Sequence, residues 1–207
     1  MKSRALLVAI ALAATALAAD SGIDPSAESG TFYEFWVSTS VQCTNPVQVF
    51  KNAAPTAQDV LTSPTLGSGP IDDGTYPCVI LVLSDTFNAT PKSGSDSGHC
   101  VAGTPFSYQI CSSGQTSLLP DGTTVSCTDG EDKIAVYFST ASVAGANGPM
   151  DPFHPPSTAS AAVEGVPLSS ALVVSGDSVG TFYNDATGSI FDTGSKCDMH
   201  STKVGFR

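Results

Sequence analysis

The pattern of apolar and polar positions is one of short strands separated by turns. Runs rich in Val, Ile, Phe, Tyr and Thr end at turn signals such as Asp73-Gly74 and Pro120-Asp121-Gly122. The run CVILVLS at 78–84 is continuously apolar, which predicts a strand buried on both faces. The predicted strands cover 31–41, 47–51, 78–84, 105–111, 123–127, 133–139, 171–175, 179–184, 188–192 and 203–206.

These strands predict an all-β fold. Only residues 56–62 carry a helical signal, with Thr56 as a cap and Asp59 three positions later. The segment DGTYPCVILVLSD is similar to strands of secreted Ig-like and transthyretin-like sandwiches, an architecture shared by unrelated functions. We therefore expect a disulfide-stabilised antiparallel β-sandwich of Ig-like or transthyretin-like architecture, with long loops.

Residues 1–18 have the pattern of a secretory signal peptide. Lys2 and Arg4 precede an apolar run at 5–14, and Ala-Leu-Ala at 16–18 suits a signal peptidase. The apolar stretch of about 15 residues is shorter than the ~20 that a membrane span requires. We expect cleavage after Ala18 or Ala19 and a product in the periplasm, outside the cell or on its surface, with no membrane span.

The remainder, 19–207, is expected to form a single sandwich domain with one unusual loop. Residues 141–162 are rich in Pro, Gly and Ala and contain no strand-like run longer than two residues. Such a segment is uncommon inside a compact domain, so it is either a linker or a long surface excursion. The part after it is short and holds one cysteine, which favours a single domain onto which the last strands dock.

Composition and charge exclude several classes of protein. The chain of 207 residues has a net charge of -11, yet only 13% of its residues are charged. The 41% of hydrophobic residues argues against a disordered acidic tail. With 8 Lys and Arg against 19 Asp and Glu, no basic surface is available for phosphates, so nucleic acid is not an expected partner.

The cysteines predict disulfides. Their even number in an exported chain, and the absence of any Cys-x-x-Cys pair, favour bridges over a zinc site. Cys78 begins the most apolar segment and is expected to pair with Cys43, whereas the close spacing of the next cysteines favours a local Cys100–Cys111 bridge. The six disulfide candidates are Cys43, Cys78, Cys100, Cys111, Cys127 and Cys197.

One motif carries a resemblance to a catalytic loop. Residues 190–195, Ile-Phe-Asp-Thr-Gly-Ser, resemble the active-site loop of pepsin-like aspartic proteases, in which two Asp-Thr-Gly aspartates share a proton. The resemblance implies a catalytic role for Asp192. The chain departs from that family because it has no second Asp-Thr-Gly and only 13 residues after Gly194. A corner between a strand and a turn is the alternative role for Asp192.

Other candidate chemistry rests on scattered residues. His99 could serve Ser97 or Ser178 in a serine hydrolase only if folding brings them together, and the Gly-x-Ser-x-Gly elbow is absent. His154 and His200 lie near Met150 and Cys197, a weak soft-metal pattern. The acidic turns at 72–73 and 129–132 suit calcium only loosely, because no twelve-residue binding loop is present. We expect no metal and no cofactor.

Two further features concern carbohydrate. Asn88-Ala89-Thr90 is an acceptor for N-glycosylation if the source is eukaryotic. Tyr33, Phe35 and Trp36 are close in sequence, and Tyr33 and Phe35 are predicted to lie on the same side of a strand. These aromatic residues could form a carbohydrate-binding face or belong to the core.

The expected function is therefore non-enzymatic. An exported β-sandwich with a binding, adhesion or cell-surface structural role, directed at a protein or glycan ligand, fits these observations best. The alternatives are a secreted hydrolase with unassigned catalytic residues and a periplasmic protein that binds a metal or another ligand. Clustering of His99, His154 or His200 with carboxylates in one pocket would favour the alternatives.

Overall fold

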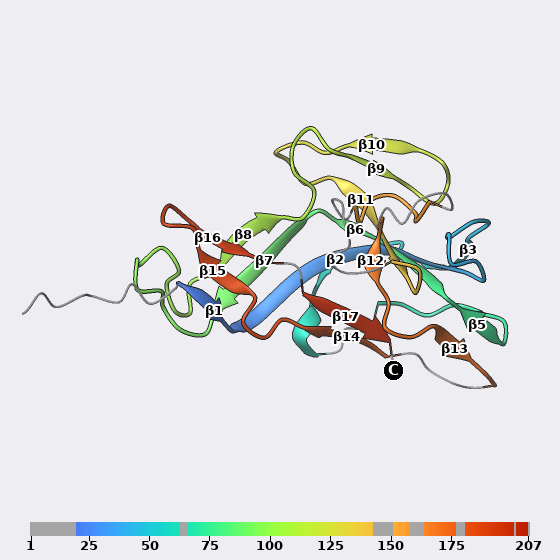
Figure 1. Ribbon diagram of the computed structural model, residues 1–207, viewed down its shortest axis with the longest axis horizontal. Helices are drawn as coiled ribbons and strands as arrows, with labels where there is room; N and C mark the ends of the chain where they lie inside the picture. The colour runs from blue at the N-terminus through green and yellow to red at the C-terminus, as the bar shows by residue number, and fades with distance from the viewer. Residues whose placement is uncertain are drawn as a thin grey trace, which may run out of the picture.

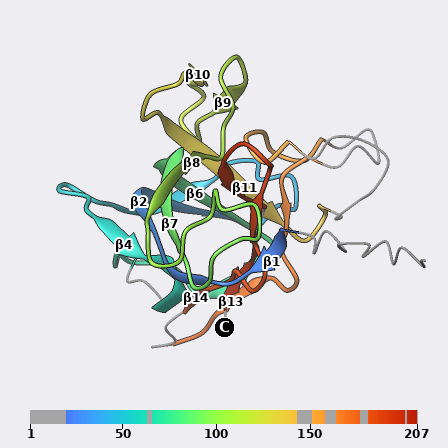
Figure 2. The same ribbon diagram turned by 90° about the vertical axis from the view of Figure 1, so that its left-hand side faces the viewer.

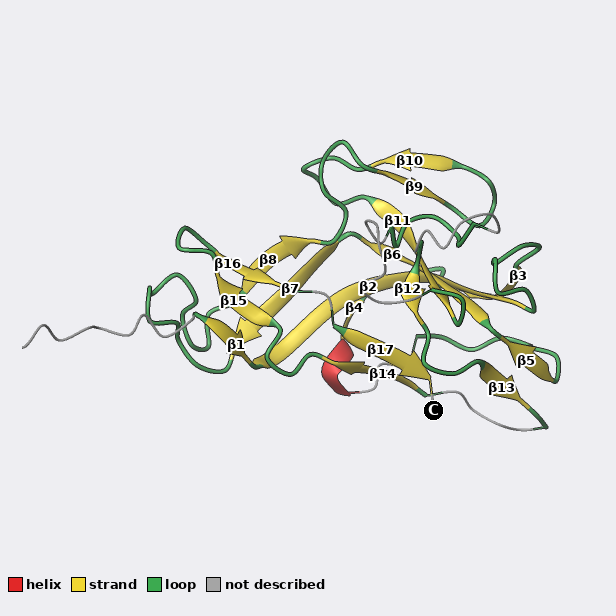
Figure 3. Ribbon diagram, viewed as in Figure 1, coloured by secondary structure: helices red, strands yellow, loops and turns green. Residues whose placement is uncertain are grey.

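The computed structural model describes residues 20–62, 66–142, 151–157, 164–176, 181–200 and 202–206. The expected signal peptide and most of the 141–162 loop lie outside these ranges. Among the described residues the only helix is the single 3-10 turn η1 (Val60–Thr62), and the other elements are strands (Figure 3).

The longest strand, β2 (Pro25–Ser38), organises the main sheet and crosses the centre of Figure 1. Along one edge it pairs first with β7 (Thr86–Pro91) and then with β6 (Cys78–Ser84), which are separated only by Asp85. Its other edge pairs with β4 (Ala57–Asp59) and β3 (Val47–Lys51).

Beyond β6 the sheet continues with two further strands, and beyond β7 it continues with one. β11 (Lys133–Ser139) pairs with β6 over the whole of its length, and β12 (Val166–Pro167) joins β11 in parallel. β8 (Phe106–Gln109) pairs with β7. The sheet order is β12-β11-β6-β2-β7-β8. Between β8 and β11 the chain leaves this sheet as an excursion of residues 110–132, and both ends of the excursion are hydrogen-bonded to Asp85.

Smaller sheets surround this one, and the two orthogonal views show the strands curling around the main sheet (Figures 1 and 2). β1, β15 and β16 form one small sheet, while β9 with β10, β5 with β13, and β14 with β17 form antiparallel pairs. Their bounds are β1 (Ser21–Ile23), β5 (Gly74–Tyr76), β9 (Thr116–Leu118), β10 (Thr124–Ser126), β13 (Leu172–Val174), β14 (Phe182–Asp185), β15 (Ile190–Asp192), β16 (Cys197–Met199) and β17 (Lys203–Phe206).

Both faces of β6 are buried, as its continuous apolar run predicts. Val79, Leu81 and Leu83 belong to the largest core cluster, which also contains Phe182 of β14, and Phe206 of β17 packs against that cluster. On the opposite face, Ile80 and Val82 pack with the cystine Cys43–Cys78 and with Leu119 beside the β9–β10 hairpin. The central strand is therefore inaccessible from either side.

All six cysteines form disulfides, and no described cysteine is free. The predicted Cys43–Cys78 bridge is confirmed. The predicted Cys100–Cys111 bridge is wrong, because Cys100 pairs with Cys197 and Cys111 pairs with Cys127. Cys111 precedes the β9–β10 hairpin and Cys127 follows it, so the hairpin brings these two cysteines together. Cys100 lies beside β16 near the end of the chain, where it pairs with Cys197. Disulfides of this number are typical of proteins that mature in an oxidising compartment.

Each predicted strand overlaps an observed strand, but several short strands and β7 were not predicted. The expected strands at 47–51, 78–84, 133–139 and 203–206 have the observed bounds. The predicted helical turn at 56–62 is half wrong, since its first part is β4. The expectation of antiparallel pairing throughout is also wrong, because β11 and β12 pair in parallel.

Candidate functional site

Asp192 lies at the end of β15, where the chain turns into β16. The Asp-Thr-Gly motif forms this corner: Asp192 Oδ1 accepts a hydrogen bond from the Gly194 amide at 2.8 Å, and Gly194 has φ of 81°. Thr193 closes the turn through its hydroxyl, which lies 3.0 Å from both the Lys196 amide and the Lys196 carbonyl. The Asp-Thr-Gly motif therefore forms a tight turn, in which the side chain of Asp192 accepts the hydrogen bond that a backbone carbonyl accepts in an ordinary turn.

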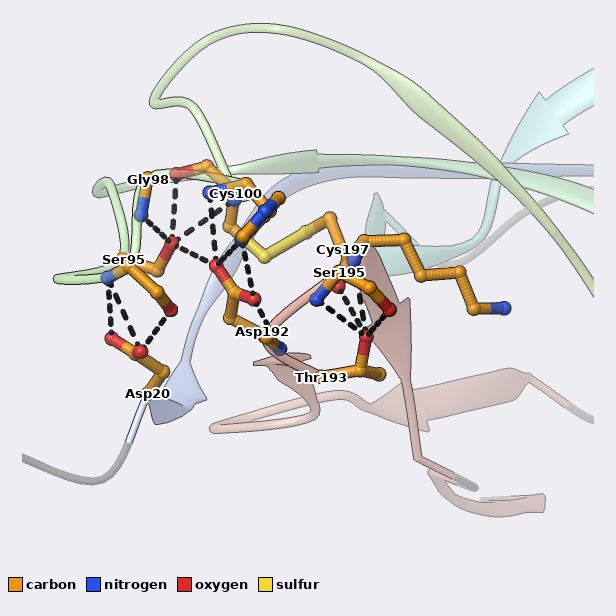
Figure 4. A network of polar contacts seen from close by, with 12 residues as sticks. Asp20, Ser95, Gly98, Cys100, Asp192, Thr193, Ser195 and Cys197 are labelled. Carbon is orange, nitrogen blue, oxygen red and sulfur yellow. Dashed lines mark hydrogen bonds and ion pairs between the residues drawn. A yellow bond between two sulfur atoms is a disulfide. The ribbon is translucent and has the colours of Figure 1, made fainter.

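The loop that precedes β8 brings more donors to the same carboxylate (Figure 4). Ser95 Oγ donates to Asp192 Oδ2 at 2.6 Å, and the His99 amide donates to that oxygen at 2.9 Å. His99 Nδ1 lies 3.1 Å from Oδ1 and 3.2 Å from Oδ2. Two of the residues singled out from the sequence, Asp192 and His99, are therefore in direct contact although 93 positions separate them.

The Cys100–Cys197 disulfide and Asp20 hold this loop against the Asp192 turn. Cys100 and Cys197, with Cα atoms 4.8 Å apart, link the loop to β16. Asp20 accepts hydrogen bonds from the Asp96 amide at 2.6 Å and from the amide and hydroxyl of Ser97, and its own carbonyl accepts from the Asp192 amide at 2.6 Å. The site is consequently built from three segments that are distant in sequence.

The hydrogen bonds keep both carboxylates ionised. Burial acts to raise the pKa of Asp192, but donation from the Ser95 hydroxyl and the Gly194 and His99 amides lowers that pKa well below its usual range. The Ser97 hydroxyl likewise holds the pKa of Asp20 below its usual value. An aspartate that must be protonated to share a proton, as in the pepsin-like pair, is disfavoured in this environment.

The contact between Asp192 and Nδ1 orients the imidazole of His99, so that Nε2 points away from the carboxylate. The acid–base pair of a serine hydrolase has the same arrangement. The His99 side chain is 39% exposed. The nearby hydroxyls have other partners, because Ser95 donates to Asp192 and Ser97 donates to Asp20. Ser178 lies outside the described residues. In the described part of the chain, no serine is placed on Nε2 as a nucleophile.

The other two histidines lie elsewhere in separate environments. His154 Nδ1 contacts Asp151 at 2.6 Å, three positions earlier in the same loop. The His200 ring stacks on Phe191, with ring centroids 3.9 Å apart. Over the described ranges, no group of three or more His, Cys, Asp or Glu residues is arranged to hold a metal ion. The acidic turns form internal contacts: Asp73 accepts from the Gly176 amide, and Asp132 accepts from Thr128.

A second polar cluster, which no sequence motif indicated, is centred on Glu34 of β2. Its carboxylate contacts Lys133 Nζ at 2.6 Å and Lys51 Nζ at 3.4 Å, and it accepts from Trp36 Nε1 at 2.9 Å and Gln48 Nε2 at 3.0 Å. Burial acts to raise the pKa of Glu34, but hydrogen bonds from Lys133 and Trp36, together with the charges of Lys133 and Lys51, lower the pKa overall. A glutamate between aromatic residues of a strand was the signal that could have identified this cluster.

The same cluster places two aromatic rings at the surface. Tyr33 and Trp36 are half-buried and pack on the β6 face that carries Ile80 and Val82, whereas Phe35 belongs to the main core. Lys133 Nζ lies 5.6 Å from the centroid of the Tyr33 ring. Irregularities in the pairing of β2 explain why the sequence grouping of Tyr33 with Phe35 is wrong: the register shifts between Phe32 and Glu34, and again beside Trp36.

Comparison of the chain with protein-family models, with curated proteins and with solved structures finds no match. None of the described helices is long and apolar enough to cross a membrane.

Proposed function

We propose that this chain is an exported, disulfide-linked β protein that binds a ligand, with a glycan as its ligand and the face around Tyr33 and Trp36 as the contact surface. A binding, adhesion or cell-surface structural role follows from that assignment. Export is supported by the signal-peptide pattern of residues 1–18 and by three disulfides. The two-layered sandwich remains part of the proposal, supported by the burial of both faces of β6.

The observation that carries the proposal is the combination of half-buried aromatic rings with polar groups at the same surface. Sugars present C–H faces that pack on aromatic rings and hydroxyls that require donors and acceptors. Tyr33 and Trp36 supply the rings, while Gln48, Lys51 and Lys133 supply polar groups at the surface. Tyr and Trp are also the residues that dominate binding energy at interfaces in general.

Glu34 gives this surface its rigidity. Because its carboxylate holds the indole N–H of Trp36, the amide of Gln48 and the ammonium group of Lys133, these side chains have less conformational freedom to lose on binding. The lysines neutralise the buried carboxylate, so the surface does not share the strong negative charge of the whole chain. An uncharged or weakly charged glycan is the ligand that fits such a surface.

The proposal is tested by screening the mature, oxidised protein on an array of cell-wall oligosaccharides and measuring any hit by calorimetry. Y33A is expected to weaken the affinity at least about tenfold, which corresponds to ~1.4 kcal/mol. Y183A, which removes a tyrosine from β14 in a different sheet, is the matched control and is expected to leave the affinity unchanged. Absence of any hit, or equal effects of the two variants in folded protein, would contradict the assignment.

A second candidate, a secreted hydrolase, is favoured by the contact between Asp192 and His99. It predicts labelling of the protein by a fluorophosphonate probe and ester hydrolysis that H99A abolishes. Under the binding proposal, the wild-type protein is neither labelled nor active, because Ser95 and Ser97 already donate to carboxylates. The two candidates therefore differ in an assay that does not require the natural substrate.

A further inference from the structure

We propose that Asn88 is an N-glycosylation site that a eukaryotic secretory pathway occupies, with the glycan projecting from the exposed face of β7. The inference depends on export and not on the ligand, so it stands apart from the binding proposal. Asn88-Ala89-Thr90 is the only Asn-X-Ser/Thr triplet of the sequence, and its middle residue is not proline.

The strand geometry turns the asparagine outward. Along β7 the side chains alternate, with Phe87 and Ala89 buried and Asn88 exposed. Phe87 belongs to the main core and Ala89 to a smaller cluster, so the inward face of β7 is fully used in packing. Substitution on the outward side of Asn88 leaves these contacts intact.

The hydrogen bonding of Asn88 leaves the reacting atom available. Ser107 Oγ on β8 donates to Asn88 Oδ1 at 2.7 Å, whereas Nδ2 has no partner among the described residues. An N-linked glycan is attached through Nδ2 and retains the carbonyl oxygen, so the Ser107 bond persists in the glycoprotein. The facing residues Ser29 on β2 and Ser107 on β8 are small and uncharged, which leaves room for the first sugar.

The chemical step is a transfer from a lipid-diphosphate-linked oligosaccharide, the donor class of the secretory pathway. Asn88 Nδ2 forms a bond to the anomeric carbon of the first sugar, the bond from that carbon to the diphosphate oxygen breaks, and Nδ2 loses one proton. The lipid diphosphate is the leaving group. The transferase acts on extended chain, so the reaction precedes the pairing of β7, and the folded structure must then accommodate the product.

The test expresses the full chain with its own leader in yeast or insect cells and measures the intact mass of the secreted protein. Wild type and S107A, which keeps the triplet, are expected to carry one oligosaccharide; N88Q and T90A are expected to lack it. Wild-type protein secreted without a glycan, or a glycan that persists in N88Q, overturns the proposal. So does a chain retained in the cytosol, because its acceptor never meets the donor.

A second measurement remains decisive if the variants are not secreted. Peptide N-glycosidase is applied to the native wild-type glycoprotein, and an aspartate in place of Asn88 is sought by peptide mass spectrometry. Release from folded protein, with the thermal transition retained, is the expected result for an exposed strand position. Release only after denaturation would overturn the exposed placement of the glycan.

Discussion

Buried acidic side chains fall into two kinds according to the partners of their oxygens. Asp192 and Glu34 are surrounded by donors, and their pKa values are lowered despite burial. Glu28 and Asp85 are also buried, and burial raises the pKa of each because fewer donors offset it. The two kinds therefore contribute to stability with opposite dependence on pH.

D192N is expected to destabilise the protein at pH 7, because the asparagine loses the charge that attracts the Ser95 hydroxyl and the backbone amides. The folded pKa of Asp192 lies below the unfolded value of about 3.9, so its contribution is fully present above that value and is lost as pH falls further. Urea unfolding at pH 7 and pH 3 measures the change.

The control for this prediction is D96N, which alters an exposed aspartate of the same loop. D96N is expected to leave the urea midpoint nearly unchanged. A D192N midpoint equal to that of D96N at pH 7, or a deficit that grows as the pH falls, would contradict the assigned role of the carboxylate.

At the scale of elements, Asp85 determines where the sheet divides. Its backbone carbonyl accepts from Ile110 at the end of β8, and its amide donates to Asp132 just before β11. Its side-chain Oδ1 accepts from the Asp132 amide at 2.9 Å and from Thr86 Oγ1 at 3.2 Å, while Oδ2 is buried without a partner among the described residues. One residue thus joins β6, β7 and both ends of the 110–132 excursion.

D85N is expected to stabilise the protein at pH 7, since asparagine keeps the Oδ1 acceptor and removes a buried charge. D85A leaves the Asp132 amide unpaired and is expected to be less stable than D85N by about 1–3 kcal/mol. The folded pKa of Asp85 is raised, so wild type gains stability as pH falls toward about 4. The advantage of D85N should therefore shrink over that range in chemical denaturation.

The strands were predictable where one physical signal dominates. The apolar run of β6 and the alternation of β3 specify their bounds without tertiary information. β7 was missed because Thr86–Pro91 reads as polar and ends in proline; it is a strand because β2 and β8 pair with its two edges. The bulges in β2 were not predictable, so the face occupied by Trp36 was not either.

At the scale of the molecule, the disulfides differ in the length of chain that they close. Cys100–Cys197 spans 97 residues, and Cys111–Cys127 spans 16. In the chain-entropy model, closures of these lengths restrict the unfolded state by about 4.7 and about 3 kcal/mol. The C100S/C197S double variant is therefore expected to lose more stability than C111S/C127S. Chemical denaturation measures the order, and the reverse order would contradict the entropic account.

The last strands contribute directly to the core that β2 and β6 begin. The Phe182 ring lies 6.2 Å from the Phe32 ring and 5.6 Å from the Phe206 ring. F182A is expected to cost about 3–5 kcal/mol, as a cavity in a packed core does. V173A, at a side chain that is 64% exposed on β13, is the control and should change stability by less than about 0.5 kcal/mol. Thermal unfolding of the F182A variant in two separate transitions would show that the last strands are not integral to the core.

The hydrophobic pattern and the cysteine positions were sufficient to predict the all-β class and the Cys43–Cys78 disulfide, and residues 1–18 predict export. Strand type and turn position depend on neighbours within a few residues, and therefore leave a local record. The contacts between distant residues were not predictable in this way: the contact of Asp192 with His99, the pairing of Cys100 with Cys197 and the donors around Glu34 are known from the folded structure alone. Such contacts depend on sheet order and register, which arise from packing across the whole chain and leave no pattern in any short segment.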